Sequence, residues 1–141
     1  MTIDRQRIRT GIPLIDNQHE AYADLVDTFF AMAMRGNVPR SILSREIGKV
    51  LNYALEHFDA EEHVMLQQNY PAYAEHRAKH TIFRDRSDTL IADAERAYDL
   101  DAYTMTLSKW LIEWFCDQVQ NDDRKLAAFL NGKPQGAVVG L

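Results

Sequence analysis

Four long segments of this 141-residue chain carry apolar residues at alternating steps of three and four, and this periodicity constrains the fold more than any other feature. The period is that of one face of an α-helix, so each segment is expected to bury a stripe of side chains. Short breaks at residues 35–39 (RGNVP), 69–71 (NYP) and 98–101 (YDLD) separate the segments. The pattern predicts an all-α, up-down-up-down four-helix bundle with an irregular N-terminal arm.

Residues that favour helix ends indicate where three of the helices begin or end. The first helix is expected to begin near Asp16 or Asn17, where Asn17 and Glu20 can form a capping box. The second is expected to have Ser41 as its N-cap. The fourth is expected to end at Gly132, because glycine readily adopts the conformation that terminates a helix.

Length and composition predict one globular domain over residues 1–141. Hydrophobic residues make up 46% of the chain, which is enough to build a core. Sixteen basic and 21 acidic residues give a net charge of −5 and form no basic stripe, so neither nucleic acid nor a membrane is an expected partner. No apolar run reaches the length of about 18 residues that a spanning helix needs, and no signal peptide is evident, which predicts a cytoplasmic protein.

Six polar side chains fall inside the otherwise apolar stripes. They are His19, His57, Glu61, His76, His80 and Gln118. An unpaired buried carboxylate or imidazole costs on the order of several kcal/mol, whereas a whole domain of this size is stable by about 5–15 kcal/mol. These groups can therefore face inward only if something satisfies them together.

The spacing of four of these residues is that of metal ligands on helices. His57 and Glu61 are four residues apart, as are His76 and His80, so each pair lies on one face of its helix. Cys116 is the only cysteine, so any metal must be bound through nitrogen and oxygen. Imidazoles and carboxylates on the facing helices of a bundle suit a two-metal site of iron or manganese.

The fourth segment, residues 101–131, contributes a further carboxylate. Asp123 is expected to reach the bundle axis from the edge of its helix opposite to Gln118. In the second segment, His63 lies well off the direction of the inward residues and is expected to face solvent. Glu62 is expected to be a surface residue for the same reason.

Each of these features also has a purely structural interpretation. A single histidine on an apolar face, such as His19, is more often a hydrogen-bonded core residue than a ligand, and one HxxxH pair can be partly exposed. A metal-free bundle that serves as an interaction module is therefore an alternative. Four inward histidines on three helices, with carboxylates on two, favour a metal, because without one they would require an unusually large polar network.

Four stretches of the chain resemble the four ordered motifs of the hemerythrins, in particular the bacterial hemerythrins. They are GIPLIDNQHE (11–20), HFDAEEHVM (57–65), YPAYAEHRAKHTIF (70–83) and WFCDQVQNDDRKL (114–126). The resemblance covers nearly the whole chain. It implies a four-helix bundle that holds two non-haem iron ions with a bridging oxo or hydroxo group.

The resemblance also implies a role for each candidate ligand. It assigns His19 and His57 to one iron, His76 and His80 to the other, and Glu61 and Asp123 as the bridges. The iron of the first pair would keep an open position for dioxygen.

The last motif departs from the family pattern at one ligand. In the family, a tryptophan is followed after two or three residues by a histidine, and an aspartate lies five residues after that histidine. Alignment of this pattern on Trp114 and Asp123 places Gln118 at the histidine position. Alignment on Trp110 would lose both ligands, since it places Val119 at the aspartate. The second iron thus lacks its third imidazole, and Gln118 could supply an amide oxygen or leave a water.

The resemblance implies a non-haem diiron protein that binds dioxygen for carriage, storage or sensing. Reversible binding is favoured over catalysis. The alternative is a diiron oxidase or peroxidase-like enzyme, or one that handles nitric oxide, at an extra open coordination position. The expected partners are dioxygen or other small neutral or anionic ligands, and a signalling or redox partner protein is left open.

Overall fold

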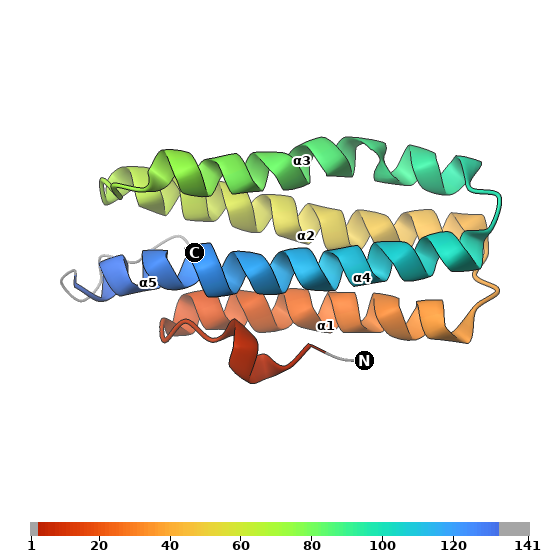
Figure 1. The fold of residues 1–141 in the computed structure, drawn as a ribbon, viewed down its shortest axis with the longest axis horizontal. Coiled ribbons are helices and arrows are strands. Elements are labelled where there is room, and N and C mark those ends of the chain that lie inside the picture. Colours follow the sequence, from red (N-terminus) through yellow and green to blue (C-terminus); the bar gives the residue numbers. More distant parts are fainter. Residues whose placement is uncertain (1–2, 133–141) are drawn as a thin grey trace.

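The computed structural model places four long helices side by side, each antiparallel to the next along the chain (Figure 1). The structure describes residues 3–132. The helical elements are η1 (Arg5–Ile8), α1 (Pro13–Arg35), α2 (Arg40–Gln67), α3 (Tyr73–Arg96), α4 (Leu100–Gln118), η2 (Val119–Asp123) and α5 (Arg124–Asn131). No strand occurs between residues 3 and 132, and the predicted all-α, up-down-up-down bundle is confirmed. The ends of the predicted domain, residues 1–2 and 133–141, lie outside the described residues.

The apolar stripes form two clusters inside the bundle. The larger one includes Val26, Phe29, Leu43, Ile47, Phe83, Leu90 and Leu111. The smaller one lies at the end of the bundle where α5 ends and includes Ile12, Ile15, Val64, Met65, Leu126 and Leu130. Each large side chain that is fully buried contributes about 1.5–3 kcal/mol to stability relative to an exposed one. The periodicity of the sequence therefore identifies the residues that stabilise the fold.

Helix α1 begins three to four residues earlier than predicted. It starts at Pro13, whose fixed φ suits the first helical position. The Asp16 carboxylate accepts hydrogen bonds from the backbone nitrogen and hydroxyl of Thr10, both at 2.7 Å, and from the Gly11 nitrogen at 3.2 Å. The predicted capping box of Asn17 is therefore wrong, because the chain turns into the helix before that residue.

Helix α2 also begins earlier than predicted, at Arg40, so Ser41 is not its N-cap. The Arg40 guanidinium donates hydrogen bonds to the carbonyl oxygens of Ala94 (2.9 Å), Glu95 (3.0 Å) and Ala97 (2.8 Å) at the end of α3. These carbonyls have no partner within their own helix. One side chain thus links the start of α2 to the end of α3.

The predicted N-terminal arm packs against the bundle beside α1 (Figure 1). Ile3 and Ile8 of this arm are buried. Arg124 donates hydrogen bonds to the backbone oxygens of Arg9 (3.0 Å), Arg7 (2.9 Å) and Gln6 (3.4 Å). The arm is therefore held to the segment that follows Asp123.

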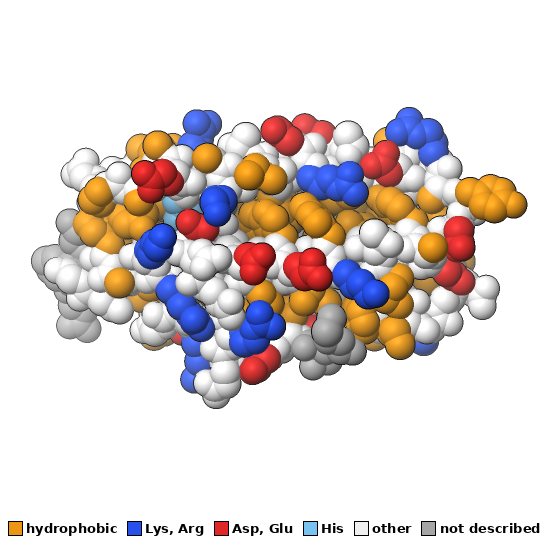
Figure 2. Space-filling model, viewed as in Figure 1, with side chains coloured by type: hydrophobic (Ala, Val, Ile, Leu, Met, Phe, Trp, Pro, Cys, Tyr) orange, Lys and Arg blue, Asp and Glu red, His pale blue; other side chains and the backbone are white. Residues whose placement is uncertain are grey.

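The outer surface carries charges of both signs, and Figure 2 shows acidic and basic side chains interspersed over one face. None of the helices between residues 3 and 132 is long and apolar enough to cross a membrane.

Candidate metal centre

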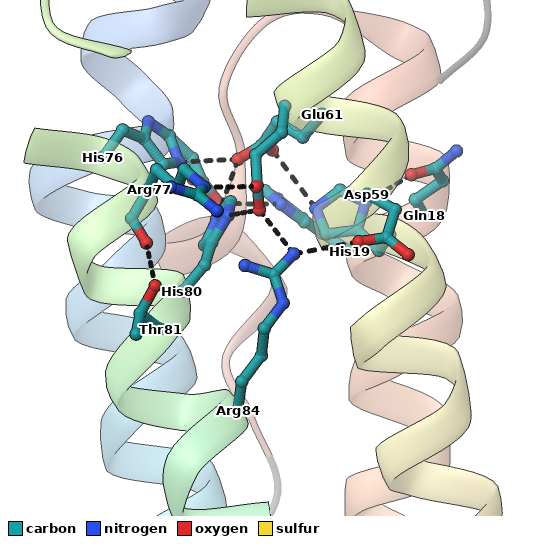
Figure 3. A network of polar contacts seen from close by, with 12 residues as sticks. Gln18, His19, Asp59, Glu61, His76, Arg77, His80, Thr81 and Arg84 are labelled. Atoms are coloured by element: carbon teal, nitrogen blue, oxygen red, sulfur yellow. Dashed lines mark hydrogen bonds and ion pairs between the residues drawn. The ribbon is translucent and has the colours of Figure 1, made fainter. Parts of the chain in front are cut away.

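A layer of polar side chains lies between the two apolar clusters. It consists of His19 from α1, His57 and Glu61 from α2, His76 and His80 from α3, and Asp123 from η2. Figure 3 shows the labelled members of this layer pointing toward one another from facing helices. Five of the six residues are buried, and the His57 side chain is only 10% exposed. The structure thus brings together all six residues that the sequence suggested as metal ligands.

Glu61 lies at the centre of this layer and its two oxygens face different histidines. Its Oε2 lies 3.2 Å from Nε2 of His57. Its Oε1 lies 2.6 Å from Nε2 of His76 and 3.2 Å from Nε2 of His80. The carboxylate therefore lies between the pair of imidazoles on α3 and the imidazole on its own helix.

Asp123 also faces one histidine from each half of the layer. Its Oδ2 lies 3.0 Å from Nε2 of His19, and its Oδ1 lies 3.0 Å from Nε2 of His76. The six side chains thus form two groups that share both carboxylates: one with His19 and His57, the other with His76 and His80. In each group, one donor atom per residue lies within 4.8 Å of the others.

Most of the atoms of this layer that could bind a metal are buried without hydrogen-bond partners among the described residues. They include Nε2 of His19, His57, His76 and His80, both oxygens of Glu61, and Oδ1 of Asp123. Several of these atoms lie within ion-pair distance of one another, yet they do not meet at hydrogen-bonding angles. Buried polar groups are normally paired, and imidazole and carboxylate lone pairs that converge in this way suit iron or a similar transition metal. The residues therefore fit a two-metal centre.

Charges in the layer balance one another. Burial alone would raise the pKa of Glu61, but His57 and the two histidines of α3 together lower that pKa well below its usual range. Burial disfavours protonated His76, yet Asp123 and Glu61 raise the pKa of His76 to about 10. A positive charge on His76 thus stabilises the two buried carboxylates. A metal pair would take over that role and release the proton.

The outward nitrogens of three imidazoles have different partners. Nδ1 of His19 lies 3.3 Å from the carbonyl oxygen of Ile8, and Nδ1 of His57 contacts Oε1 of Gln18. Nδ1 of His80 lies 2.8 Å from Oε2 of Glu62. These contacts orient each Nε2 toward the centre of the layer.

Glu62 is therefore not the surface residue that the sequence predicted. Its side chain is only 12% exposed because it reaches across to α3, where it contacts His80 and Arg84. Helical periodicity describes one helix at a time and does not reveal such a contact. The sequence contained one indication of this contact. His80 and Arg84 are four residues apart, so they lie on one face of α3, where a single carboxylate can reach both. His63 is exposed, as predicted.

A π-helical turn places Asp123. In a regular α-helix, a residue five positions after Gln118 would be rotated by about 140°, which agrees with the expected position of Asp123 on the opposite edge of the helix. Instead, η2 winds more widely between them, and Gln118 and Asp123 line the same cavity. That expectation was wrong. Such π-turns often occur at functional sites.

This cavity adjoins the half of the layer that contains His19 and His57. Its volume is about 20 Å³, close to what one water-sized molecule needs. Its other lining residues are Tyr22, Ala54, Phe58, Trp114, Phe115 and Gln118, so apart from the polar layer it is largely aromatic. The Nε2 atom of Gln118 has no hydrogen-bond partner among residues 3–132.

Trp114 and Gln118 also line a hollow of about 220 Å³ on the outside of the bundle, together with Lys79 and Asn121. These two side chains therefore separate the cavity from the surface. Asn121, which follows Gln118 by about one turn, is exposed and belongs to the outer hollow.

Comparison with known proteins places the chain in a family. Residues 10–130 match the family described as Hemerythrin HHE cation binding domain. Bacteriohemerythrin of Methylococcus capsulatus is 23% identical over 126 residues, which cover 88% of this chain and 92% of that protein. Bacteriohemerythrin of Stenotrophomonas maltophilia is 26% identical over 121 residues, which cover 85% and 75%.

A solved structure described as wild-type hemerythrin has the same fold. It superimposes with a TM-score of 0.77 at 22% identity, over 92% of this chain and 97% of that one. A second solved structure, described as a mutant of hemerythrin, gives a TM-score of 0.74 at 23% identity over 92% and 96%. With the family match over most of its length, the chain belongs to the hemerythrin family.

Proposed function

We propose that the chain holds two non-haem iron ions with a bridging oxo or hydroxo group and binds dioxygen reversibly, as a carrier, store or sensor. Its membership of the hemerythrin family supports a diiron, oxygen-binding function. The observation that carries the proposal is a buried layer of six donor residues whose two carboxylates each face both halves. When bound, a ferrous pair supplies the electrons for reversible dioxygen binding.

Six residues are proposed as ligands. His19 and His57 would hold one iron, His76 and His80 the other, and Glu61 and Asp123 both. The carboxylates offset part of the charge of two divalent cations in a buried place, where an unbalanced charge is costly. In the family pattern that the sequence resembles, Gln118 stands where the iron of His76 and His80 would take a third imidazole, so it could supply an amide oxygen there or leave a water.

The residues around the layer support binding of a small neutral molecule. The cavity beside His19 and His57 is walled by Tyr22, Phe58 and Phe115, so ions and bulk water are disfavoured there. Its volume of about 20 Å³ admits a molecule of the size of dioxygen more readily than an organic substrate. Reversible binding is therefore favoured over the oxidation of a larger compound.

A second candidate is an enzyme that reduces peroxide or handles nitric oxide. The unpartnered amide nitrogen of Gln118 in the cavity favours it, because a polar donor beside the centre can assist proton-dependent chemistry. We place either activity in the cytoplasm, since the only cysteine, Cys116, is a free thiol that requires no oxidising compartment. A redox or signalling partner protein remains part of the proposal for a sensor or an enzyme.

Iron analysis of protein purified without chelator tests the proposal first. We expect two irons per chain and an absorbance change on oxygenation that reverses when oxygen is removed. One zinc per chain, or no bound metal after iron supplementation, would overturn the diiron centre. Sustained consumption of a reductant with peroxide or nitric oxide, without a reversible oxygenated form, would favour the enzyme.

A further inference from the structure

The two halves of the polar layer differ in what lies behind their histidines. On α3, Nδ1 of His80 faces the carboxylate of Glu62 at 2.8 Å. On the other half, Nδ1 of His57 contacts the neutral amide of Gln18, and Nδ1 of His19 lies 3.3 Å from a backbone carbonyl. Among these partners only the one behind His80 carries a formal charge.

Glu62 is held in place by two basic side chains of α3. Arg84 contacts Oε2 of Glu62 through Nη2 at 2.5 Å, and the same nitrogen lies 2.9 Å from the exposed Asp59 carboxylate. Arg77 lies on the other oxygen of Glu62, with Nε at 3.4 Å. Figure 3 shows Arg84 extending from α3 toward the centre and Asp59 on the neighbouring helix. Because Arg84 and Arg77 hold both oxygens, the carboxylate that faces His80 has little freedom to turn away.

The His80 ring is also fixed from the side. Phe58 stacks on it, with ring centroids 4.1 Å apart and planes at 14°. The Arg84 guanidinium lies 5.7 Å from the centroid of the Phe58 ring. Glu62, Phe58 and Arg84 thus form one packed unit that orients Nε2 of His80 toward Oε1 of Glu61.

We propose that Glu62 is a positioning residue that strengthens metal binding at the His76 and His80 half, which lacks the third imidazole of the family pattern. This inference rests on the proposed diiron function. A carboxylate that accepts a hydrogen bond from Nδ1–H fixes the tautomer in which Nε2 is free to bind a metal, and it increases the electron density at Nε2. An amide or a carbonyl oxygen, as found behind His57 and His19, provides the first effect but less of the second.

Titration of the metal-free, full-length protein with cobalt(II) tests this role without oxygen chemistry. The wild-type protein is expected to bind two cobalt ions per chain. Glu62→Gln keeps an oxygen that can accept from His80 but removes the charge, so one of the two ions should bind about 10–100-fold more weakly while the other is unchanged. Glu46→Gln is the matched control, because Glu46 pairs with Lys49 at the surface, on the order of 20 Å along α2 from Glu62, and should change neither.

A second pair of variants identifies the affected half. The single variant His80→Gln is expected to lose the cobalt ion of the His76 and His80 half. The double variant His80→Gln/Glu62→Gln should then bind the remaining ion with the same affinity as His80→Gln. Equal weakening of both ions by Glu62→Gln, or no change in either, would overturn the positioning role alone. A wild-type protein that binds no cobalt and no iron would overturn the diiron proposal and this inference with it.

Discussion

Gln118 and Asp123 line the same cavity although they are five positions apart, because the chain between them is wound as a π-helix. An α-helix of the same sequence would turn the carboxylate of Asp123 away from His19 and His76, which it meets at 3.0 Å. The local winding is thus what gives the polar layer its second shared carboxylate.

Removal of the other shared carboxylate should abolish the centre. In Glu61→Ala, both halves lose a charged oxygen, and the imidazoles of His57, His76 and His80 lose their common neighbour. We expect the iron content of the purified protein to fall from two per chain to nearly none. Iron analysis, with circular dichroism to verify that the bundle is folded, provides the measurement.

His63→Ala is the matched control for that variant. His63 lies two residues after Glu61 on the same helix but is exposed. Its iron content should equal that of the wild-type protein. If both variants lost iron to the same extent, the orientation of α2 in the bundle would be wrong.

Phe83 tests the larger apolar cluster. It is fully buried against Phe58, Trp110 and Trp114. Phe83→Ala should lower the free energy of unfolding by about 3–5 kcal/mol, because it removes a large buried side chain and leaves a cavity. Urea denaturation measures the loss. Ile82→Ala, at a neighbouring side chain that is 59% exposed, should change stability by less than about 0.5 kcal/mol.

Arg40 tests the link between α2 and α3. Arg40→Ala removes donors from the carbonyl oxygens of Ala94, Glu95 and Ala97, which end α3. Because the contact is partly exposed to water, we expect a loss of about 1 kcal/mol in the free energy of unfolding. Arg45→Ala, on the same helix but paired at the surface with the adjacent Glu46, should be nearly neutral in the same denaturation experiment.

The sequence was sufficient to predict the bundle and the inward position of the candidate ligands. Both follow from the periodicity of an α-helix: His19 falls in the stripe of Ile15 and Tyr22, and Glu61 in that of Val64. Burial of an apolar stripe is a property of one helix at a time. It can therefore be read without knowing how the helices pack.

Features that depend on departures from a regular helix, or on contacts between helices, were not predictable in this way. The π-turn before Arg124 changes the phase of the last helix, and no residue type in the sequence specifies it. The contact of Glu62 with His80 joins two helices, and periodicity places Glu62 outside. The start of α1 at Pro13 is different, because proline suits the first helical position and this indication was present in the sequence.

Gln118 is expected to control how long the oxygenated form lasts. It lines the cavity beside His19 and His57, and with Trp114 it separates this cavity from the outer hollow that contains Lys79. An amide at this position supplies a weaker ligand than an imidazole, and its unpartnered nitrogen can donate a hydrogen bond within the cavity. Both effects should help protons and water reach the bound oxygen, so the oxygenated wild-type protein should decay to the diferric state quickly.

Gln118→His adds one imidazole at a position that already accommodates a side chain of similar length, and on the proposed alignment it would supply the imidazole that the resemblance to the hemerythrins implies there. We expect the oxygenated form of this variant to decay more slowly than that of the wild-type protein, by about 10-fold or more if one ligand is gained. Stopped-flow absorbance at one pH and one oxygen concentration compares the two rates.

Gln118→Leu separates the two effects of the glutamine, because it removes the amide donor without adding a ligand. It should slow the decay only if proton donation by Gln118 contributes. Equal rates in the wild-type and histidine proteins, or faster decay with histidine, would mean that the glutamine already serves as an adequate ligand.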